Sequence, residues 1–157
     1  MKKHLLTILT LSLISLSAFA DDKQEALDFF NNYVNSANNY SPTVAEMYSP
    51  SAKIIRQVVK PDGTTVDVET DTATYIKQMK IGQAGAKLKH YKNTYTNILA
   101  TPTQGGYKVS SLRQPSGEDY KLKTYMIVKK QPDGKWLIIE EMMQTKVQTF
   151  LRYANKT

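Results

Sequence analysis

Apolar residues in the first half of the chain recur at the spacing of α-helices. Over residues 22–39 they fall at steps of three and four, which predicts an amphipathic helix whose inner face is formed by Leu27, Phe30, Val34 and Ala37. Ser41-Pro42 then combines an N-cap residue with a proline at the first helical position. This pair predicts a short second helix that carries, on one side, Val44, Met47 and Tyr48.

A β-hairpin and a third helix are predicted next. Residues 52–60 are rich in β-branched side chains, a Pro-Asp-Gly turn follows, and residues 64–69 return as the second strand. A helix over about 72–81 is indicated by the helical spacing of Tyr75, Ile76 and Met79. Gly82 and Gly85 are expected to end this helix.

From residue 90 onward the apolar pattern changes to a period of two, which is the period of β-strands. Strands are predicted over residues 90–100, 107–114, 119–130 and 135–146, and the turns between them contain glycine or proline. Helices grouped early and long strands late predict an α+β fold, with helices packed on one face of a curved, mainly antiparallel sheet.

The first twenty residues have the pattern of a secretory signal peptide. Lys2 and Lys3 provide a charged start, and residues 5–16 form an apolar core that is too short to span a bilayer. Ala18-Phe19-Ala20 is a small-residue cleavage motif. The chain is therefore predicted to be cut after Ala20, and residues 21–157 are predicted to form a single domain in the bacterial periplasm. A retained membrane anchor is the alternative.

The mature chain contains no cysteine and a single histidine, His90. In an oxidising compartment, packing alone must then hold the fold, and thiol catalysis and cysteine-ligated zinc are excluded. His90 is expected to be a solvated residue near the start of a strand. There is no paired-histidine spacing and no glycine-rich phosphate loop. We therefore expect no metal and no cofactor.

Basic residues outnumber acidic residues by 21 to 14 over the whole chain. Because Lys2 and Lys3 belong to the predicted signal peptide, the mature chain has 19 basic residues and a net charge of +5. The excess is spread along the sequence, which is typical of a solvated surface. It also suits contact with an anionic membrane surface or an acidic partner. Nucleic acid is not an expected partner, since the chain has no nucleic-acid-binding motif.

Three stretches of the chain resemble the nuclear transport factor 2-like superfamily, which includes ketosteroid isomerase and polyketide-cyclase-like proteins. Residues 47–52 are similar to the end of its second helix, residues 71–79 to its third helix, and residues 133–139 to its final hairpin turn and last strand. The resemblance covers residues 22–147. It implies a cystatin-like cone, in which three N-terminal helices pack in the concave face of a strongly curved sheet and leave a pocket. The superfamily includes enzymes, carriers and interaction modules, so its fold does not determine an activity.

The pocket implied by this resemblance can be lined by residues of the predicted elements. Tyrosine combines a large ring with a polar tip, and methionine adapts to irregular shapes, so both suit a site for a small apolar or amphipathic ligand. The expected lining residues are Tyr33, Met47, Tyr48, Tyr75, Met79, Tyr95, Met126, Trp136 and Glu140. The alternative is that these side chains simply fill the core.

Glu140 is the candidate catalytic residue. If Trp136 and Ile138 point into the cone, as the family suggests, a period of two puts Glu140 on the same face. A carboxyl group among apolar side chains such as Met126 would then be placed like the general base of an isomerase. Alternatively, Glu140 pairs with Arg113 or a lysine across the sheet, or accepts a hydrogen bond from a tyrosine.

These observations lead to three hypotheses about function. The leading one is a periplasmic, non-enzymatic binding protein that holds a small apolar or amphipathic ligand, lipids included, in the cone. The second is an isomerase- or dehydratase-type enzyme that uses Glu140 as base and a tyrosine as hydrogen-bond donor. The third is a protein-interaction or scaffold module of an envelope or secretion complex.

The last predicted strand is apolar on both of its faces. Leu137, Ile139 and Met143 alternate with Trp136 and Ile138. An antiparallel sheet with one face in water alternates apolar and polar residues instead, so the second face is expected to be covered. We expect a homodimer that forms through the convex face of the sheet.

Overall fold

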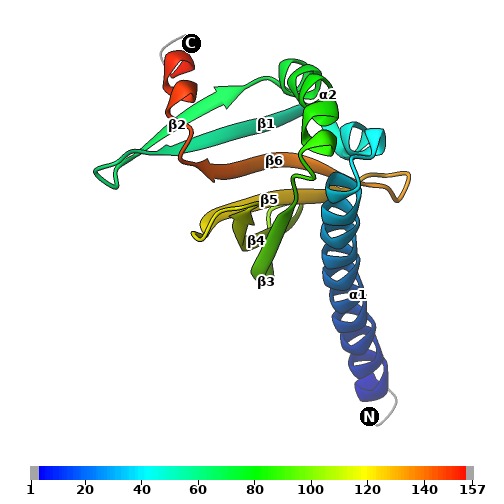
Figure 1. The fold of residues 1–157 in the computed structure, drawn as a ribbon. Coiled ribbons are helices and arrows are strands. Elements are labelled where there is room, and N and C mark those ends of the chain that lie inside the picture. The colour runs from blue at the N-terminus through cyan, green and yellow to red at the C-terminus, as the bar shows by residue number, and fades with distance from the viewer. Residues whose placement is uncertain (1–3, 155–157) are drawn as a thin grey trace.

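The computed structural model describes residues 4–154, with side chains from Ala18 onward (Figure 1). It has the helices α1 (His4–Asn38) and α2 (Thr72–Leu88) and the short 3-10 helices η1 (Pro42–Met47) and η2 (Gln148–Tyr153). The strands are β1 (Tyr48–Val59), β2 (Thr65–Thr70), β3 (Asn93–Thr103), β4 (Gly106–Pro115), β5 (Leu122–Lys130) and β6 (Trp136–Thr145). Tyr48, which we expected on the second helix, is the first residue of β1.

The strands of the described region form one sheet in the order β2-β1-β6-β5-β4-β3. All neighbouring strands are antiparallel except β1 and β6, which are parallel. α1 packs on β3 and β4, and α2 packs on β1. Figure 1 shows α2, η1 and the C-terminal end of α1 gathered beside one another at the sheet. This arrangement is the predicted α+β cone, and we call the face that packs on the helices the concave face.

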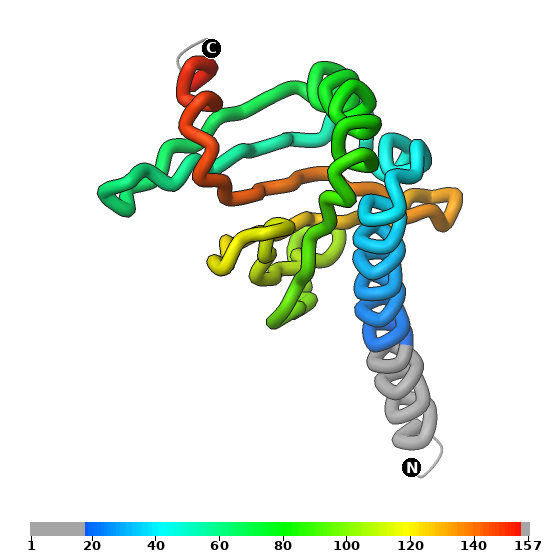
Figure 2. The backbone as a smooth tube through the Cα atoms, in the orientation of Figure 1, coloured from blue at the N-terminus to red at the C-terminus, as the bar shows by residue number. Residues whose placement is uncertain are grey.

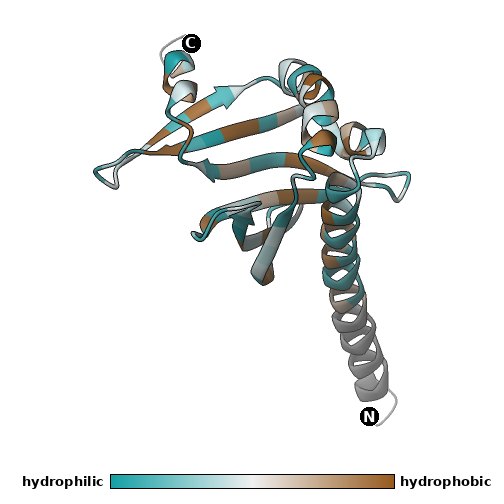
Figure 3. Cartoon of the chain, viewed as in Figure 1, coloured by the Kyte–Doolittle hydropathy of each residue, from teal (hydrophilic) through white to brown (hydrophobic). Residues whose placement is uncertain are grey.

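The core fills the space between α1 and the concave face. Its largest fully buried apolar side chains are Phe30 from α1, Ile54 from β1 and Ile138 from β6. Burial of each side chain of this size contributes about 1.5–3 kcal/mol to folding. Along β4, buried residues alternate with half-buried ones, as predicted for a strand with one covered face. Figure 3 shows apolar and polar segments alternating along β1 as well.

A β-bulge in β6 changes which residues face the core. Val128 pairs with Ile138 and Ile127 pairs with Glu140, so Ile139 is an extra residue that no β5 residue opposes. Because side chains alternate between faces with a period of two, one extra residue reverses the faces for the rest of the strand. Ile138 before the bulge and Glu141 after it are both fully buried.

α2 continues past Gly82 and Gly85, where we had predicted that it would end. Each glycine costs a helix interior about 1 kcal/mol relative to alanine, which the helix tolerates. The turn after the helix supplies the C-cap. His90 adopts a left-handed conformation (φ 51°), and the backbone N–H of Tyr91 bonds to the carbonyl of Ala86 at 2.9 Å. His90 is exposed, as predicted, but it lies in this turn and not in a strand.

The start of the chain is helical through the predicted cleavage motif at residues 18–20. The hydroxyl of Tyr107 on β4 donates a hydrogen bond to the carbonyl of Phe19 at 2.9 Å, and Lys130 pairs with Glu25 at 2.8 Å. Residues 1–3 and the side chains of residues 1–17, all within the predicted signal peptide, lie outside the described residues. Among the described residues, no helix has the length and apolar character needed to cross a membrane.

The C-terminal segment returns to the edge of the sheet. η2 contacts both β1 and β2, and Figure 2 shows it beside the hairpin that these strands form. Phe150 is half-buried at this contact. The segment therefore covers part of the edge strand β2, which would otherwise present unpaired backbone groups.

Candidate functional site

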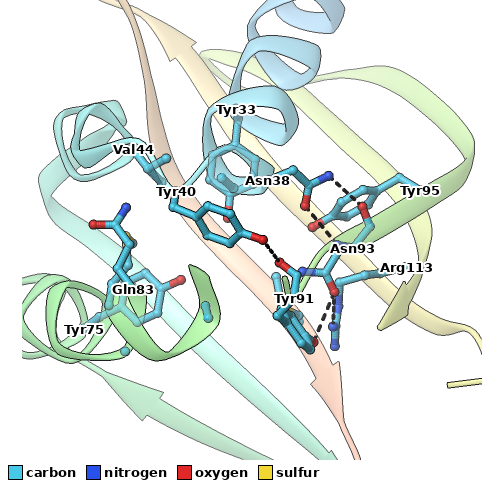
Figure 4. A pocket seen from close by; sticks show the side chains of 15 residues that line it. Tyr33, Asn38, Tyr40, Val44, Tyr75, Gln83, Tyr91, Asn93, Tyr95 and Arg113 are labelled. Atoms are coloured by element: carbon cyan, nitrogen blue, oxygen red, sulfur yellow. Dashed lines mark hydrogen bonds between the residues drawn. The ribbon is translucent and has the colours of Figure 1, made fainter. Parts of the chain in front are cut away.

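A cavity of about 270 Å³ lies between the C-terminal end of α1, α2 and the concave face of β3, β4 and β6 (Figure 4). Its volume is close to the lower end of the range for small-molecule sites, roughly 300–1,000 Å³. Its lining is mainly apolar and aromatic, and it includes Tyr33, Tyr40, Val44, Tyr75, Met79, Tyr91, Tyr95 and Met143. Polar groups in the lining come from Asn38, Gln83, Asn93 and Arg113.

Helical spacing brings the lining residues of each helix to one side. Tyr33 and Ala37 are one turn apart on α1, and the lining residues of α2 include Met79, Gln83 and Ala86. A reciprocal pair of hydrogen bonds ties α1 to β3. The Asn38 amide donates to the Asn93 carbonyl at 2.8 Å, and its oxygen accepts from the Asn93 N–H at 2.9 Å. The end of α1 is thereby fixed against the start of β3.

The rim of the cavity is also hydrogen-bonded. Tyr40 adopts a left-handed conformation (φ 58°), and its hydroxyl donates to the carbonyl of Tyr91 at 3.1 Å. Arg113 Nη1 donates to Asn93 Oδ1 at 2.9 Å. Figure 4 shows these bonds on the side of the cavity where Tyr91, Asn93 and Arg113 meet. The Tyr40 side chain and the Arg113 guanidinium are held in place there.

Beneath the cavity lies a buried polar network centred on Glu141, which has no solvent exposure. Tyr48 Oη donates to Glu141 Oε2 at 2.5 Å, and Tyr33 Oη donates to the same oxygen at 3.4 Å. Arg56 Nη1 donates to Glu141 Oε1 at 2.9 Å and forms an ion pair with it. The Arg56 guanidinium also stacks over the Tyr75 ring, 4.7 Å from its centroid.

The tyrosines of this network remain protonated at neutral pH. Burial raises the pKa of Tyr33 and of Tyr48 well above the ordinary value, and the negative charge of Glu141 raises both further. Burial also raises the pKa of Tyr75. The hydroxyls of Tyr33 and Tyr48 therefore act as hydrogen-bond donors to the Glu141 carboxylate.

Four of the nine predicted lining residues are brought together at the cavity: Tyr33, Tyr75, Met79 and Tyr95. Tyr48 lies underneath them, in the Glu141 network. Met47 and Met126 are buried in the core, as the alternative interpretation held. Trp136 lies at the other end of the core, where its indole N–H donates to Glu25 Oε2 at 2.9 Å.

The prediction that Glu140 faces the pocket is wrong. The β-bulge at Ile139 turns the Glu140 side chain to the convex face, where Tyr125 Oη donates to Glu140 Oε1 at 2.7 Å. A hydrogen bond to a tyrosine was the alternative considered for this residue. The carboxylate on the concave face is the next residue, Glu141.

Several residues of the site were not predicted from the sequence. Arg113 could have been found, because a period of two along β4 puts it on the same face as the buried Tyr107 and Val109. Asn38 and Asn93 interact only because the fold brings α1 to β3, and no local pattern predicts such a pair. Glu141 was missed because the bulge is not visible in the pattern of residue types.

The described residues contain no cluster of three or more histidine, cysteine, aspartate or glutamate side chains placed to hold a metal ion. Side-chain amides, tyrosine hydroxyls and one guanidinium provide the polar chemistry of the cavity. Such groups can orient a ligand by hydrogen bonds.

No protein-family model and no curated protein matches this sequence. Solved structures do match. An NTF2-like protein with a cystatin-like fold from Novosphingobium aromaticivorans aligns with a TM-score of 0.60 and 10% identity, over 87% of this chain and 89% of that one. The chain has the nuclear transport factor 2-like fold. The fold expected from the sequence is thus confirmed.

Other solved structures with the NTF2-like fold belong to proteins with different names and roles. Nuclear transport factor 2 from Cryptosporidium parvum aligns with a TM-score of 0.54 and 12% identity, over 80% of this chain and 93% of that one. A candidate ketosteroid isomerase from Shewanella frigidimarina aligns with a TM-score of 0.54 and 15% identity, over 74% and 91%. At these identities the likeness extends to the fold alone, so function must be argued from the residues of this chain.

Proposed function

We propose that this chain is a binding protein that holds a small apolar or amphipathic ligand in the tyrosine-lined cavity and does not transform it. The observation that carries the proposal is the lining: five tyrosines surround a mainly apolar space. Aromatic rings bind apolar groups through contact area, and the hydroxyl tips orient polar groups by hydrogen bonds. A scaffold module has no need of such a space, so the cavity favours binding over the scaffold hypothesis.

Two observations favour binding over isomerase- or dehydratase-type catalysis. Glu140 lies on the convex face, away from the cavity. Glu141 lies beneath the cavity, but it is fully buried and its oxygens already accept bonds from Arg56, Tyr48 and Tyr33. A general base must come within hydrogen-bonding distance of the proton that it removes, and neither carboxylate meets this requirement for a ligand in the cavity.

The proposal is tested by filling the cavity. Ala86 lines the cavity on α2, whereas Ala84 lies on the exposed side of the same helix. Native mass spectrometry of the protein purified from its host is expected to show a co-purifying small molecule. Ala86→Trp should abolish its retention, and the matched control Ala84→Trp should preserve it. Retention by both variants, or a wild-type protein without ligand that also binds no apolar probe, would contradict the proposal.

We also propose that the protein acts in the periplasm after cleavage at Ala20. The charged start, the short apolar core and the small-residue motif of residues 18–20 support this location. The intact mass of protein released by osmotic shock should correspond to a chain that begins at Asp21. A full-length chain recovered in the membrane fraction would be evidence for a retained anchor.

A further inference from the structure

Arg113 is a buried cation in the wall of the cavity. It projects from β4, is 5% exposed and belongs to the cavity lining. Its Nη1 donates to Asn93 Oδ1 at 2.9 Å and its Nη2 to the Gln144 carbonyl at 2.8 Å, whereas Nε has no hydrogen-bond partner. Ser111 Oγ is the other buried side-chain atom without a partner in the described part of the chain, but Ser111 does not line the cavity.

The charges of the concave interior do not balance. The side chain of Arg56 is 12% exposed and forms an ion pair with the fully buried Glu141. Arg113 has no such partner, since no described aspartate or glutamate lies within ion-pair distance of it. Arginine stays charged in proteins, and a buried charge without an opposite charge is unfavourable. The described interior therefore carries one positive charge that the chain does not match.

The sequence around Arg113 also has more positive than negative charge. No acidic residue occurs between Asp71 and Glu118, a segment that includes all of α2, β3 and β4. The same segment contains six lysines in addition to Arg113. These three elements form walls of the cavity, so these walls come from a segment that has basic residues and no acidic ones.

We infer that the ligand carries a carboxylate, which accepts hydrogen bonds from the Arg113 guanidinium while the apolar body of the ligand lies against the tyrosines. The inference rests on the proposed binding function and adds the chemical class of the ligand. The guanidinium group suits a carboxylate because neighbouring N–H groups can reach both oxygens at once. Asn93 and Gln144 already hold the guanidinium, so little side-chain freedom is lost on binding. A cavity of about 270 Å³ suits a small amphipathic acid.

Three ten-carbon probes that differ only in the head group test this inference: decanoate, decanamide and decylamine. Their affinities for the purified protein are measured by isothermal titration calorimetry at neutral pH, below the concentrations at which the probes aggregate. Decanoate should bind about ten- to a hundredfold more tightly than decanamide, which is the range expected for charge-assisted hydrogen bonds. Decylamine should bind most weakly.

Two substitutions locate the effect. Arg113→Gln should abolish the preference, so that decanoate and decanamide bind with equal affinity. The control Lys92→Gln removes a charge from the same acid-free segment but at an exposed position outside the cavity lining, so the preference should remain. Circular dichroism checks the fold of each variant. If Arg113→Gln does not fold, Arg113→Lys is used instead. Lysine keeps the positive charge but lacks the paired N–H groups of the guanidinium, so it should retain only part of the preference for decanoate over decanamide.

The outcomes separate this inference from the proposed function. Equal binding of decanoate and decanamide by the wild-type protein, or a preference that survives Arg113→Gln, overturns the carboxylate inference and leaves the binding function standing. If the wild-type protein binds none of the three probes, the binding function itself is contradicted, and the inference that rests on it falls too.

Discussion

Arg56 and Glu141 stabilise the protein only as a pair. Arg56 Nη1 lies 2.9 Å from Glu141 Oε1, and the Tyr48 and Tyr33 hydroxyls complete the coordination of the carboxylate. Each partner would be an unmatched buried charge without the other. For such pairs, removing one partner costs more than the pair itself contributes, because the desolvated charge stays behind.

Glu141→Gln should therefore lower the free energy of unfolding by about 3–5 kcal/mol, measured by urea denaturation. Glu140→Gln is the matched control, because the half-buried Glu140 makes a hydrogen bond with Tyr125 at the surface of the sheet. This substitution should lower the free energy of unfolding by about 1 kcal/mol or less. Similar losses for the two variants would contradict the placement of these neighbours on opposite faces of β6.

The buried tyrosines make stability depend on pH at the alkaline end. Burial raises the pKa of Tyr33 and Tyr48 above the ordinary value of about 10. Above pH 10 the unfolded chain releases tyrosine protons that the native state keeps, so stability is complete below about pH 10 and declines above it. Each retained proton lowers the free energy of unfolding by about 1.4 kcal/mol per pH unit. Denaturation curves from pH 9 to 11 should show this decline, with a shallower slope in Tyr48→Phe.

At the scale of elements, the two glycines inside α2 are a local weakness of the helix. A Cβ built on Gly82 or Gly85 meets nothing within 4 Å, so neither position needs glycine for lack of space. Gly82→Ala and Gly85→Ala should each raise the free energy of unfolding by about 0.5–1 kcal/mol, visible as a higher melting temperature. Gly106→Ala is the opposite control, because its Cβ would lie 2.0 Å from the Val128 carbonyl. Destabilisation by the two α2 substitutions would count against a helix at these positions.

The outer face of α2 combines exposed apolar residues with lysines. Ile81 is 72% exposed and Leu88 is 82% exposed, and their spacing of seven residues puts them on one side of the helix. Lys77, Lys80 and Lys87 belong to the same helix, which has no acidic residue. We propose that this face contacts anionic membrane surfaces, with the apolar residues at the headgroup boundary and the lysines on the headgroups.

Vesicle co-sedimentation tests this contact. The protein should sediment with phosphatidylglycerol vesicles and not with phosphatidylcholine vesicles, and added salt should weaken the interaction. The double substitution Ile81→Ser with Leu88→Ser should reduce it. Val147→Ser, which changes an exposed apolar residue at the start of η2, is the control that should not. Equal binding to both vesicle types would contradict the proposal.

The boundaries of most elements follow from local patterns, which is why they could be predicted. Helical and strand periods and the turn residues locate the hairpins, the start of α2 and the late strands close to their observed positions. The end of α2 was missed because a left-handed His90 supplied the cap that glycine usually provides. The bulge at Ile139 depends on pairing with β5, which no single strand reveals.

At the scale of the whole molecule, the convex face of the sheet remains partly apolar. Leu137 on β6 and Ile127 on β5 are half-buried there, and Leu99 on β3 is 54% exposed. We propose that a second copy of the chain covers this face. Light scattering after size exclusion should give the mass of a dimer. Leu99→Lys should shift the protein toward monomer, whereas Leu88→Lys on α2 should not. A wild-type monomer at micromolar concentration would contradict the proposal.

The site was harder to predict than the fold because it depends on distances along the cone as well as on faces. Tyr33, Tyr75, Met79 and Tyr95 line the cavity, since helical spacing and strand alternation place them on inner faces. Met126 and Trp136 also belong to inner faces, but they lie deeper in the core or beyond it. The alternation of apolar and polar residues shows which side chains face the interior of the cone. It does not show how far along the cone each of them lies.

The pairing of β1 with β6 has a consequence for the order in which the protein can fold. β6 is the last strand in sequence, yet it lies between the β1–β2 hairpin and the β3–β4–β5 meander. Until residues 136–145 are available for pairing, the two halves of the sheet have no strand in common and the core stays open. Late closure of the core would suit the export that we propose, because an exported chain crosses the membrane before it folds.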